Sequence, residues 1–524
     1  MGPGPARRPG ALVAFAALAV LLAGCGGDAS KDGGGNGGTD RSSPEGGRPP
    51  NLIVVMTDDQ TVKSFGPRAM PFSWRLFHDE RSAIFESAVA VPPLCCPVRA
   101  GFLTGQYPHN HGVLANVPGY ADLEDKENVL PAWLGRAGYH TALVGKYLNQ
   151  YARVGRADPA PGWDSWFAYH LYPAYFDYEI SDDGEVSASG SEPDDYSTHR
   201  FNDRAVAEIA DPDRDRPLFM WLAQNAPHID SSTLGPCNEE VATPASRADY
   251  REFASEPLPR DPSYDEADRS DKPRNISDRD PIADREERIM TLRWRCALAS
   301  LRAVDEGMEE IVAALEEAGE LEETVLVFLS DNGYFFGEHA IGKDKRLPYR
   351  ASAEVPMAIR VGERVASTAP PSEIEPLVGT FDLTPTLLDY AGAEPCVEGE
   401  CRPLDGRSLR PLLEEVPDGY PADRAILLEL DESEAGSYAF EALRTKRYLY
   451  SRLHRDRDGP LPRAGIELYD LEQDPYELEN LWTLDRGAVR ELQGELDARL
   501  DRLAACEGSE ERRFSRAEAP GDCE

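Results

Sequence analysis

The sequence feature that most limits the possible folds is a series of short apolar segments, several of which end directly in polar residues. The first segment, Asn51–Met56, is an apolar run that ends at Thr57-Asp58-Asp59-Gln60. Apolar runs of this length are typical of strands that are buried on both faces of a sheet. Further segments of the same kind are Thr141–Val144, Leu218–Leu222, Thr324–Leu329 and Met357–Val361. Together these segments predict a buried central sheet.

Helical stretches separate the predicted strands. They lie at about Asn128–Ala137, Arg200–Ile209 and Asp284–Glu317, and an amphipathic helix follows at Leu383–Tyr390. Strands that alternate with helices indicate an α/β fold with a large central mixed, mostly parallel sheet flanked by helices. Ligands of such sheets bind beyond the carboxyl ends of the strands. The polar residues just past these ends are Asp58, Asp59, Lys146, His228 and Asp331.

The C-terminal part of the chain has a different pattern. Beyond Leu409 come shorter β segments at Ala425–Leu430, Tyr438–Leu453 and Glu467–Leu471, followed by leucines at helical spacing between Val489 and Leu503. This pattern predicts a smaller domain of antiparallel strands plus a helix. We therefore expect a larger α/β domain at residues 51–408 and a C-terminal α+β subdomain at 409–524.

The N-terminus has the features of an export signal. Arg7 and Arg8 precede the apolar run Ala11–Leu22, which is too short to span a bilayer comfortably. The following Leu22-Ala23-Gly24-Cys25 looks like the lipobox of bacterial lipoproteins, in which the cysteine carries the lipid. We therefore predict a signal peptide at 1–25, a Gly/Ser-rich tether at 26–50, and an exported, extracytoplasmic cell-surface lipoprotein held to the membrane only through Cys25. The alternative is an ordinary cleaved signal with an incidental cysteine.

The remaining cysteines suit an oxidising compartment. Cys396 with Cys401 and Cys506 with Cys523 each close a short loop, and a pair of Cys237 with Cys296 is plausible, although sequence alone does not fix connectivity. Adjacent cysteines rarely bridge each other. Cys95-Cys96 therefore calls for another explanation.

Charge excludes several kinds of partner. The 524 residues include 55 Lys and Arg against 94 Asp and Glu, a formal net charge of −39. Sequence-independent binding of nucleic acid or of an anionic membrane surface needs clustered basic residues, so we expect neither. The same charge predicts repulsion of long, highly charged anionic polymers at low salt, which favours small or singly charged anions as ligands.

The most specific motif is the segment 93–105, which reads PLCCPVRAGFLTG. It resembles the sulfatase signature C-x-P-x-R-x-x-x-L-T-G, with the fixed positions occupied by Cys95, Pro97, Arg99, Leu103, Thr104 and Gly105. Proline suits the first turn of a helix, which would place Cys95 at a helix N-terminus, where free N–H groups favour an anion. Arg99 lies one turn further on and could clamp the same oxygens.

The resemblance implies a mechanism and a set of site residues. In sulfatases the first cysteine, here Cys95, is oxidised by a formylglycine-generating enzyme to formylglycine, whose hydrated aldehyde supplies the nucleophilic oxygen. The family uses one Ca²⁺ ion, held by oxygen ligands that suit a hard cation. The residues that match the metal site are Asp58, Asp59, the modified Cys95, Asp331 and Asn332.

Further blocks extend the resemblance from about Asn51 to Leu481. Gly145-Lys146 and Asp344-Lys345-Arg346 match the two sulfate-binding lysines, and Ala226-Pro227-His228 matches the histidine that contacts the bridging oxygen. The details are most like the N-acetylglucosamine-6-sulfatase/arylsulfatase branch. The implied catalytic residues are Cys95, Arg99, Lys146, His228 and Lys345. Of these, His228, or Lys345 beside it, is expected to protonate the leaving alcohol.

Some positions depart from the family pattern. Val98 stands where Ser, Ala or Thr is usual, which bears on how the modifying enzyme accepts Cys95. Leu148 stands where many arylsulfatases carry a second catalytic histidine, and His111 and His339 are candidates for that missing role. In a different register, Lys343 would replace Lys345.

These observations predict a sulfuric ester hydrolase that acts on a small sulfated sugar or aryl sulfate. One alternative is a phosphonate or phosphate monoester hydrolase of the same superfamily. Another is a non-catalytic, lipid-anchored glycan-binding protein that kept the pocket but lost the modification.

Overall fold

The computed structural model describes residues 48–155, 157–212, 214–229, 247–416, 419–430, 439–456, 459–460, 465–484, 487–506 and 523. The predicted signal peptide with Cys25, and the tether up to residue 47, lie outside these residues. The stretch from Arg48 to Glu524 is one compact unit, described below by itself. Within the part of the chain that the structure describes, no helix is long and apolar enough to cross a membrane.

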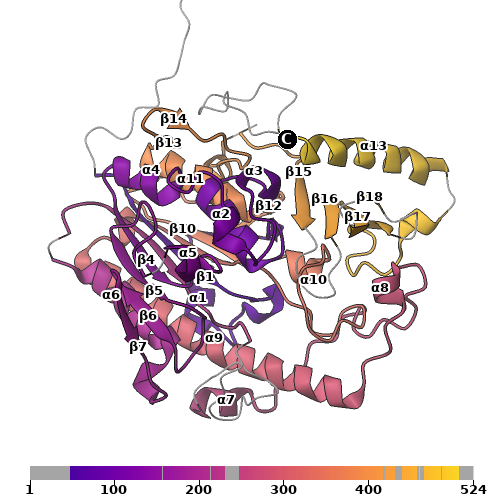
Figure 1. Cartoon of the computed structure of the whole chain (residues 1–524), viewed down its shortest axis with the longest axis horizontal. Helices are drawn as coiled ribbons and strands as arrows, with labels where there is room; N and C mark the ends of the chain where they lie inside the picture. Colours follow the sequence, from indigo (N-terminus) through magenta and orange to yellow (C-terminus); the bar gives the residue numbers. More distant parts are fainter. Residues whose placement is uncertain are drawn as a thin grey trace, which may run out of the picture. The chain divides into compact units, whose positions relative to one another are not determined.

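A ten-stranded mixed sheet forms the centre of this unit (Figure 1). Its strand order is β11 (Glu373–Ile374), β2 (Ser82–Phe85), β10 (Met357–Val361), β9 (Thr324–Ser330), β1 (Asn51–Thr57), β8 (Leu218–Ala223), β4 (His140–Gly145), β5 (Ser165–Tyr169), β6 (Glu179–Asp182) and β7 (Glu185–Ala188). The middle strands from β9 to β5 are mutually parallel, whereas β10, β6 and β7 pair antiparallel with their neighbours. The prediction of a mixed, mostly parallel sheet is therefore confirmed.

Helices cover both faces of the sheet because the central strands are apolar on both sides. Successive strand residues point to opposite faces, so Leu52 and Val54 of β1 enter one buried cluster while Ile53 and Val55 enter another. The first cluster includes residues from α2 (Cys95–Thr104), α4 (Leu130–Arg136) and α11 (Leu383–Ala391). The second cluster includes residues from α6 (Ser197–Ala210) and α9 (Asp284–Ala318), and α1 (Pro71–Leu76) also packs against it. Figure 1 shows α6 and α9 across the sheet from α2, α4 and α11.

The segment 230–280 is rich in Pro, Asp and Arg, which predicts a long surface loop or a substrate-side insertion, and it is described from residue 247 onward. There it contains two short helices, α7 (Arg247–Phe253) and α8 (Arg274–Ser277). The other short elements are β3 (Ala88–Val89), α3 (Pro108–His111), α5 (Tyr151–Gly155), α10 (Arg350–Ala353), β12 (Val378–Gly379), β13 (Cys396–Val397), β14 (Glu400–Cys401) and α12 (Arg410–Leu413).

A second, antiparallel sheet follows in the C-terminal part. It consists of β15 (Ala425–Leu430), β16 (Ala439–Thr445), β17 (Tyr448–Asp456), β18 (Gly459–Pro460) and β19 (Ile466–Asp470). The predicted segment Tyr438–Leu453 is thus a hairpin of two strands. The final helix, α13 (Gly487–Ala504), buries Leu496, Leu500 and Leu503 with this sheet, as the leucine spacing predicts.

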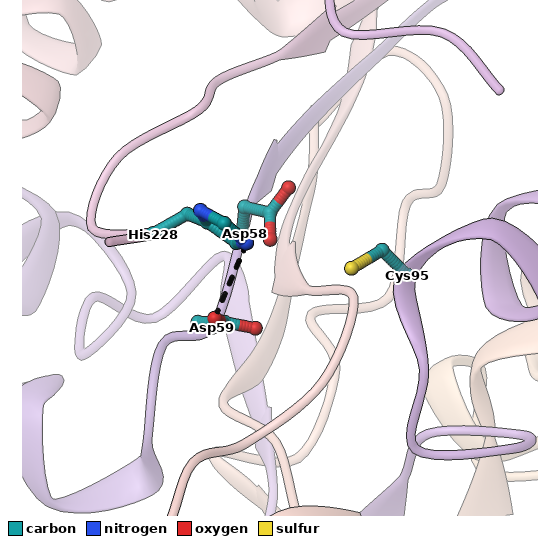
Figure 2. Close-up of side chains that lie close together, drawn as sticks. All are labelled: Asp58, Asp59, Cys95 and His228. Carbon is teal, nitrogen blue, oxygen red and sulfur yellow. Dashed lines mark ion pairs between the residues drawn. The ribbon is translucent and has the colours of Figure 1, made fainter. Parts of the chain in front are cut away.

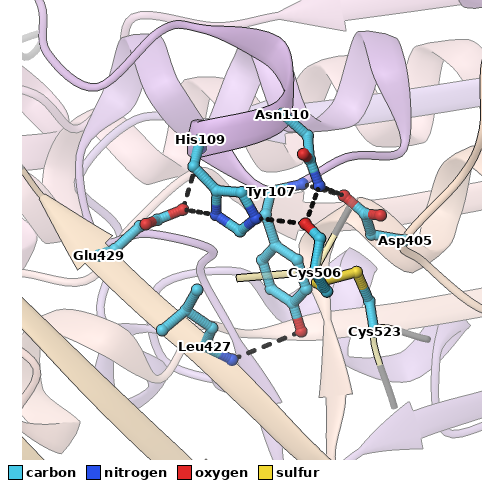
Figure 3. The surroundings of a disulfide bond; sticks show 8 residues. All are labelled: Tyr107, His109, Asn110, Asp405, Leu427, Glu429, Cys506 and Cys523. Atoms are coloured by element: carbon cyan, nitrogen blue, oxygen red, sulfur yellow. Dashed lines mark hydrogen bonds and ion pairs between the residues drawn. A yellow bond between two sulfur atoms is a disulfide. The ribbon is translucent and has the colours of Figure 1, made fainter. Parts of the chain in front are cut away.

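Disulfide bonds link two pairs of described cysteines. Cys396–Cys401 and Cys506–Cys523 are both formed, which confirms these predicted pairs. Cys296 is also disulfide-bonded, while Cys237 lies outside the described residues. Figure 3 shows His109 of α3 beside the Cys506–Cys523 bond, with Nδ1 2.6 Å from Glu429 of β15 and Nε2 2.9 Å from the Cys506 carbonyl oxygen. These contacts join α3, the second sheet and the segment that directly follows α13.

Candidate active site

The predicted polar residues meet at one edge of the large sheet. Asp58 and Asp59 follow β1, and Asp331 with Asn332 follows the adjacent strand β9. Lys146 follows β4 and His228 lies shortly after β8, on the other side of β1. These four strands are parallel neighbours, so their carboxyl ends and the residues after them share one edge.

Two backbone features bring these side chains together. Asp59 adopts a left-handed conformation with φ 64°, which is uncommon for a residue other than glycine. This turn lets the consecutive carboxylates of Asp58 and Asp59 face the same space, although neighbours in an extended strand point apart. Gly145 precedes Lys146 at φ 111°, where a Cβ atom would lie 2.1 Å from the Ala223 carbonyl oxygen. Glycine at this position therefore allows β4 to approach β8 closely.

Cys95 reaches the site from the opposite side. It is the first residue of α2, it is buried, and its thiol is free. Figure 2 shows its sulfur atom directed toward Asp58, Asp59 and His228. Lys345 Nζ lies 2.8 Å from Cys95 Sγ and also donates a hydrogen bond to Asp59 Oδ1. Lys345 thus connects the end of β1 with the start of α2.

Arg99 is fully buried one turn into α2, and its guanidinium group is engaged with protein oxygens. Nε donates to Asp331 Oδ2 at 2.8 Å, Nη2 to Asp58 Oδ2 at 3.1 Å, and Nη1 to the Lys146 carbonyl oxygen at 2.7 Å. This side chain therefore fixes the two carboxylates and the start of the segment after β4. Its predicted contact with sulfate oxygens stays a prediction.

The other basic groups also face the carboxylates. Lys146 Nζ donates a hydrogen bond to Asp58 Oδ2, and His228 Nε2 lies 3.7 Å from Asp59 Oδ2. His228 Nδ1 lies 2.6 Å from the Ile229 carbonyl oxygen. A carbonyl only accepts hydrogen bonds, so Nδ1 carries the proton, and Nε2 of the neutral ring is an acceptor.

These contacts set the protonation states. Burial alone would raise the pKa of Asp58, but the cations Lys146, Arg99 and Lys345 outweigh it and hold that pKa below its usual range. Burial raises the pKa of the Cys95 thiol to about 11, so unmodified Cys95 is a protonated thiol at neutral pH. Burial likewise lowers the pKa of His228. Burial lowers the pKa of Lys345, but the carboxylates of Asp59 and Asp58 outweigh it and raise the pKa, so the ammonium group stays charged.

The oxygen-rich end of the site fits a hard metal ion. Asp58 Oδ1 and Asn332 Oδ1 are both buried and accept no hydrogen bond, although buried polar atoms are normally paired. Asn332 Nδ2 donates to Asp59 Oδ1 at 2.6 Å. Within the described parts of the chain, ligand atoms of Asp58, Asp59, Cys95 and His228 lie within 4.8 Å of one another. Carboxylate and amide oxygens are the ligands that Ca²⁺ prefers.

Comparison with known proteins identifies the family. A family model described as Sulfatase matches residues 50–393. The chain belongs to the sulfatase family. A second model, described as N-sulphoglucosamine sulphohydrolase, C-terminal, matches residues 337–506 of this sulfatase. The predicted family and hydrolase class are thereby confirmed.

Individual relatives differ in the fraction of their own length that aligns with this chain. The N-acetylglucosamine-6-sulfatase of Homo sapiens is 27% identical over 500 residues, which cover 88% of this chain and 86% of that protein. The extracellular sulfatase SULF-1 homolog of Drosophila melanogaster is 31% identical over 386 residues, which cover 71% of this chain and 32% of that protein. This sulfatase therefore spans about a third of the fly relative.

A solved structure also shares the fold. It is a complex of a protein with its substrate D-glucosamine-2-N,6-O-disulfate, and it is 24% identical, with a TM-score of 0.65. The match covers 87% of this sulfatase and 97% of that chain.

Two histidines considered for the role missing at Leu148 contact other groups. His339 Nδ1 lies 2.7 Å from Glu266 Oε2, and its ring packs against Tyr349. His111 is buried, and its Nδ1 accepts a hydrogen bond from the Val113 amide at 3.1 Å. Neither histidine has a described contact with the carboxylates at the end of β1. Of the two lysines in the segment 343–345, Lys345 contacts these carboxylates, and no such contact is described for Lys343.

Two residues near the site were not predicted. Tyr334 and Arg293 line a small cavity with Asp59, of about 10 Å³, which is room for about one water molecule. Tyr334 directly follows Asp331-Asn332-Gly333, so its position just after β9 could have identified it as a residue of the site. Arg293 lies within the long helix α9, where nothing in the local sequence distinguishes it from a surface arginine.

Proposed function

We propose that this sulfatase hydrolyses a 6-sulfate ester on a small amino sugar, with a formylglycine made from Cys95 as the nucleophile. The observation that carries the proposal is the position of Lys345, whose ammonium group contacts both Cys95 Sγ and Asp59 Oδ1. A cation between the nucleophile position and the metal-binding carboxylates lies where a transferring sulfate group would develop charge. The similarity to the human N-acetylglucosamine-6-sulfatase supports the choice of sugar.

One Ca²⁺ ion would be held by Asp58, Asp59, Asp331, Asn332 and the modified residue 95. The unpaired buried oxygens of Asp58 and Asn332 support this assignment. When bound, the ion supplies Lewis-acid stabilisation of charge on the sulfate oxygens. Arg99 keeps the Asp58 and Asp331 carboxylates oriented through its two charged hydrogen bonds.

The nucleophile depends on maturation by a formylglycine-generating enzyme. Formylglycine supplies a hydrated aldehyde, which carries the attacking hydroxyl group. Unmodified Cys95 is a poor substitute, because burial keeps its thiol protonated. Its place at the first turn of α2 puts free backbone N–H groups beside the oxygen that would become negative.

The lysines would hold the sulfate group. Lys146 and Lys345 both direct their ammonium groups into the space between Asp58, Asp59 and Cys95. Preorganised cations of this kind stabilise the transition state more than the ground state.

The leaving alcohol needs a proton, and either His228 or Lys345 could donate it. Lys345 carries a proton at neutral pH, whereas His228 has its only ring proton on Nδ1, which the Ile229 carbonyl oxygen accepts. We therefore assign general-acid catalysis to Lys345 and a hydrogen-bonding role to His228.

The N-terminal sequence and the similarity to the extracellular fly sulfatase support the proposal that the protein is exported. The chain would be an extracytoplasmic lipoprotein, with a lipid on Cys25 and a tether that leads to the catalytic domain at 51–408 and the subdomain at 409–524. Metabolic labelling with a fatty acid tests the anchor, since Cys25→Ser should abolish incorporation. Labelling that persists in this variant would rule out Cys25 as the lipid site.

Sulfate release from N-acetylglucosamine 6-sulfate tests the function, using protein matured with a formylglycine-generating enzyme. Turnover of 4-nitrophenyl sulfate should exceed turnover of the phosphate and phosphonate analogues. Cys95→Ala serves as the control, because it lacks the modifiable residue. Faster turnover of a phosphonate would favour the alternative hydrolase, and sugar binding without release of sulfate would favour the glycan-binding alternative.

A further inference from the structure

Lys345 lies near the middle of a segment, residues 339–350, whose two ends are held by one carboxylate. That carboxylate belongs to Glu477, which follows β19 in the C-terminal part of the chain and is buried. Its Oε2 lies 3.8 Å from His339 Nε2. Both of its oxygens also accept hydrogen bonds from the Arg350 amide, at 3.1 and 3.2 Å. A single side chain therefore contacts the segment on both sides of Lys345 in the sequence.

The turn at His339 needs outside contacts to keep its shape. His339 and Ala340 have φ values of 54° and 59°, and residues other than glycine are uncommon in this conformation. The His339 amide donates to the Ser263 carbonyl oxygen at 2.7 Å, while the ring contacts Glu266 through Nδ1 and Glu477 through Nε2. Burial alone would lower the pKa of His339, but these two glutamates outweigh it and raise that pKa, which favours the charged imidazolium. Opposite charges thus hold the turn in place.

Glu477 is itself part of a buried polar network. Lys272 Nζ donates to the Glu477 carbonyl oxygen at 2.6 Å and to the Tyr469 hydroxyl group at 3.1 Å. The hydroxyl groups of Tyr469 and Tyr349 both donate to Glu467 Oε1 at 2.6 Å. Tyr349 belongs to the segment 339–350, so this network holds the end of the segment a second time. Buried polar networks whose members are hydrogen-bonded are rigid.

The position of this segment matters because the side chain of Lys345 contacts two other parts of the molecule. Its ammonium group donates to Asp59, after β1, and lies 2.8 Å from Cys95 Sγ, at the start of α2. A shift of the segment would move the ammonium group away from both contacts. An error of about 1 Å in the position of a catalytic group can cost about 10²-fold in rate.

We propose that Glu477 is a positioning residue for Lys345: by holding both ends of the segment 339–350, it keeps the ammonium group beside Asp59 and Cys95. This inference rests on the proposed function, because Lys345 is the group to which we assign general-acid catalysis. No described contact joins Glu477 to Lys345 itself, so the segment transmits the effect. The C-terminal part of the chain thereby contributes to catalysis without touching the substrate.

The test asks whether Glu477→Gln acts through Lys345. Glutamine keeps an acceptor for the Arg350 amide but loses the negative charge that faces His339. Glu477→Gln should lower kcat by about 10²-fold for N-acetylglucosamine 6-sulfate and by only about tenfold for 4-nitrophenyl sulfate, whose leaving group needs no proton. In the Lys345→Ala background the same substitution should have no further effect, because the group that it positions is gone. His339→Gln should show the same selective loss and the same dependence on Lys345.

Glu429→Gln is the matched control. Glu429 is a buried carboxylate of β15 that also pairs with a histidine, His109, and it has no described contact with the segment 339–350. Its substitution should leave the ratio between the two substrates unchanged. Thermal melts show which variants fold, and His339→Gln provides the test if Glu477→Gln does not. Equal losses on both substrates, or losses that multiply with those of Lys345→Ala, would overturn the inference.

A measurement without turnover separates this inference from the proposed function. Acylation of lysines by an N-hydroxysuccinimide ester, followed by peptide mass spectrometry, reports how well each ammonium group is protected. Glu477→Gln should raise the labelling rate of Lys345 several-fold, whereas Lys146, which pairs with Asp58, should keep its rate. If the wild-type protein releases sulfate from neither substrate, the proposed function fails, and the labelling decides the role of Glu477 by itself. An unchanged labelling rate at Lys345 would overturn that role.

Discussion

Replacement of Lys345 by alanine should damage the enzyme in a way that depends on the leaving group. The ammonium group contacts Cys95 Sγ at 2.8 Å and also donates to Asp59, so it can both stabilise the sulfate charge and supply a proton. Loss of one preorganised donor costs about 10²–10³ in kcat. Loss of a general acid costs a further factor of about 10²–10⁴, but only where the leaving group needs a proton.

Substrates with different leaving groups separate the loss of charge stabilisation from the loss of general-acid catalysis. 4-Nitrophenolate is a stable leaving group, so Lys345→Ala should lose only about 10²–10³ with 4-nitrophenyl sulfate. With N-acetylglucosamine 6-sulfate, whose alcohol leaves poorly, the loss should be at least about 10⁴. His228→Ala should lower both activities by similar factors, because neutral His228 has no proton on Nε2.

Steady-state kinetics on both substrates measures these factors. Lys446→Ala is the matched control, since Lys446 forms an exposed ion pair with Glu375 in a different part of the molecule. Thermal melts check that each variant is folded. Equal losses on the two substrates for Lys345→Ala, together with a selective loss for His228→Ala, would refute the assignment of the general acid to Lys345.

Three further predictions concern the metal, a buried ion pair and a histidine. Chelation of divalent cations should abolish sulfate release and lower Tm, and added Ca²⁺ should restore both; binding at a hundredfold excess over Kd contributes about 2.7 kcal/mol. A chelated enzyme that keeps its activity and Tm would contradict the metal site. Asp382→Asn leaves Arg424 buried without its charged partner, so urea unfolding should show a loss of about 3–5 kcal/mol, against less than about 1 kcal/mol for Lys446→Ala. Burial lowers the pKa of His109, but Glu429 outweighs it and raises the pKa to about 9, above an unfolded value of about 6.5. The protonated histidine therefore stabilises the fold fully below pH 6.5 and progressively less as pH rises through about 9. His109→Gln should remove that part of the pH dependence of Tm, and an unchanged profile would count against the ion pair.

The central strands were predictable because their signal is local. β1, β4, β8 and β9 each consist of an apolar run that precedes polar residues, and the predicted and observed bounds differ by at most one residue at either end. The strands β6 and β7, at one end of the sheet, carry no such run, and their pairing depends on neighbours elsewhere in the chain. Segment Tyr438–Leu453 was predicted as β structure, but the hairpin turn within it was not.

The active-site residues were predictable where a motif fixes both identity and order. Cys95 and Lys345 are 250 residues apart, and the family pattern anticipated that both would belong to the site where they now meet. Motifs do not specify what a side chain faces once the chain is packed. Arg99 contacts two carboxylates and a carbonyl group, His339 pairs with Glu266, and Arg293 reaches the site from a distant helix.

The central claim is that residue 95 acts as formylglycine, and one measurement tests it most directly. Peptide mass spectrometry of protein from the native host determines the fraction of residue 95 that is formylglycine, and sulfate release from N-acetylglucosamine 6-sulfate is measured on the same preparations. The account predicts that activity rises in proportion to that fraction and is absent when only cysteine is present. Full activity in preparations whose Cys95 peptide contains only cysteine would contradict it.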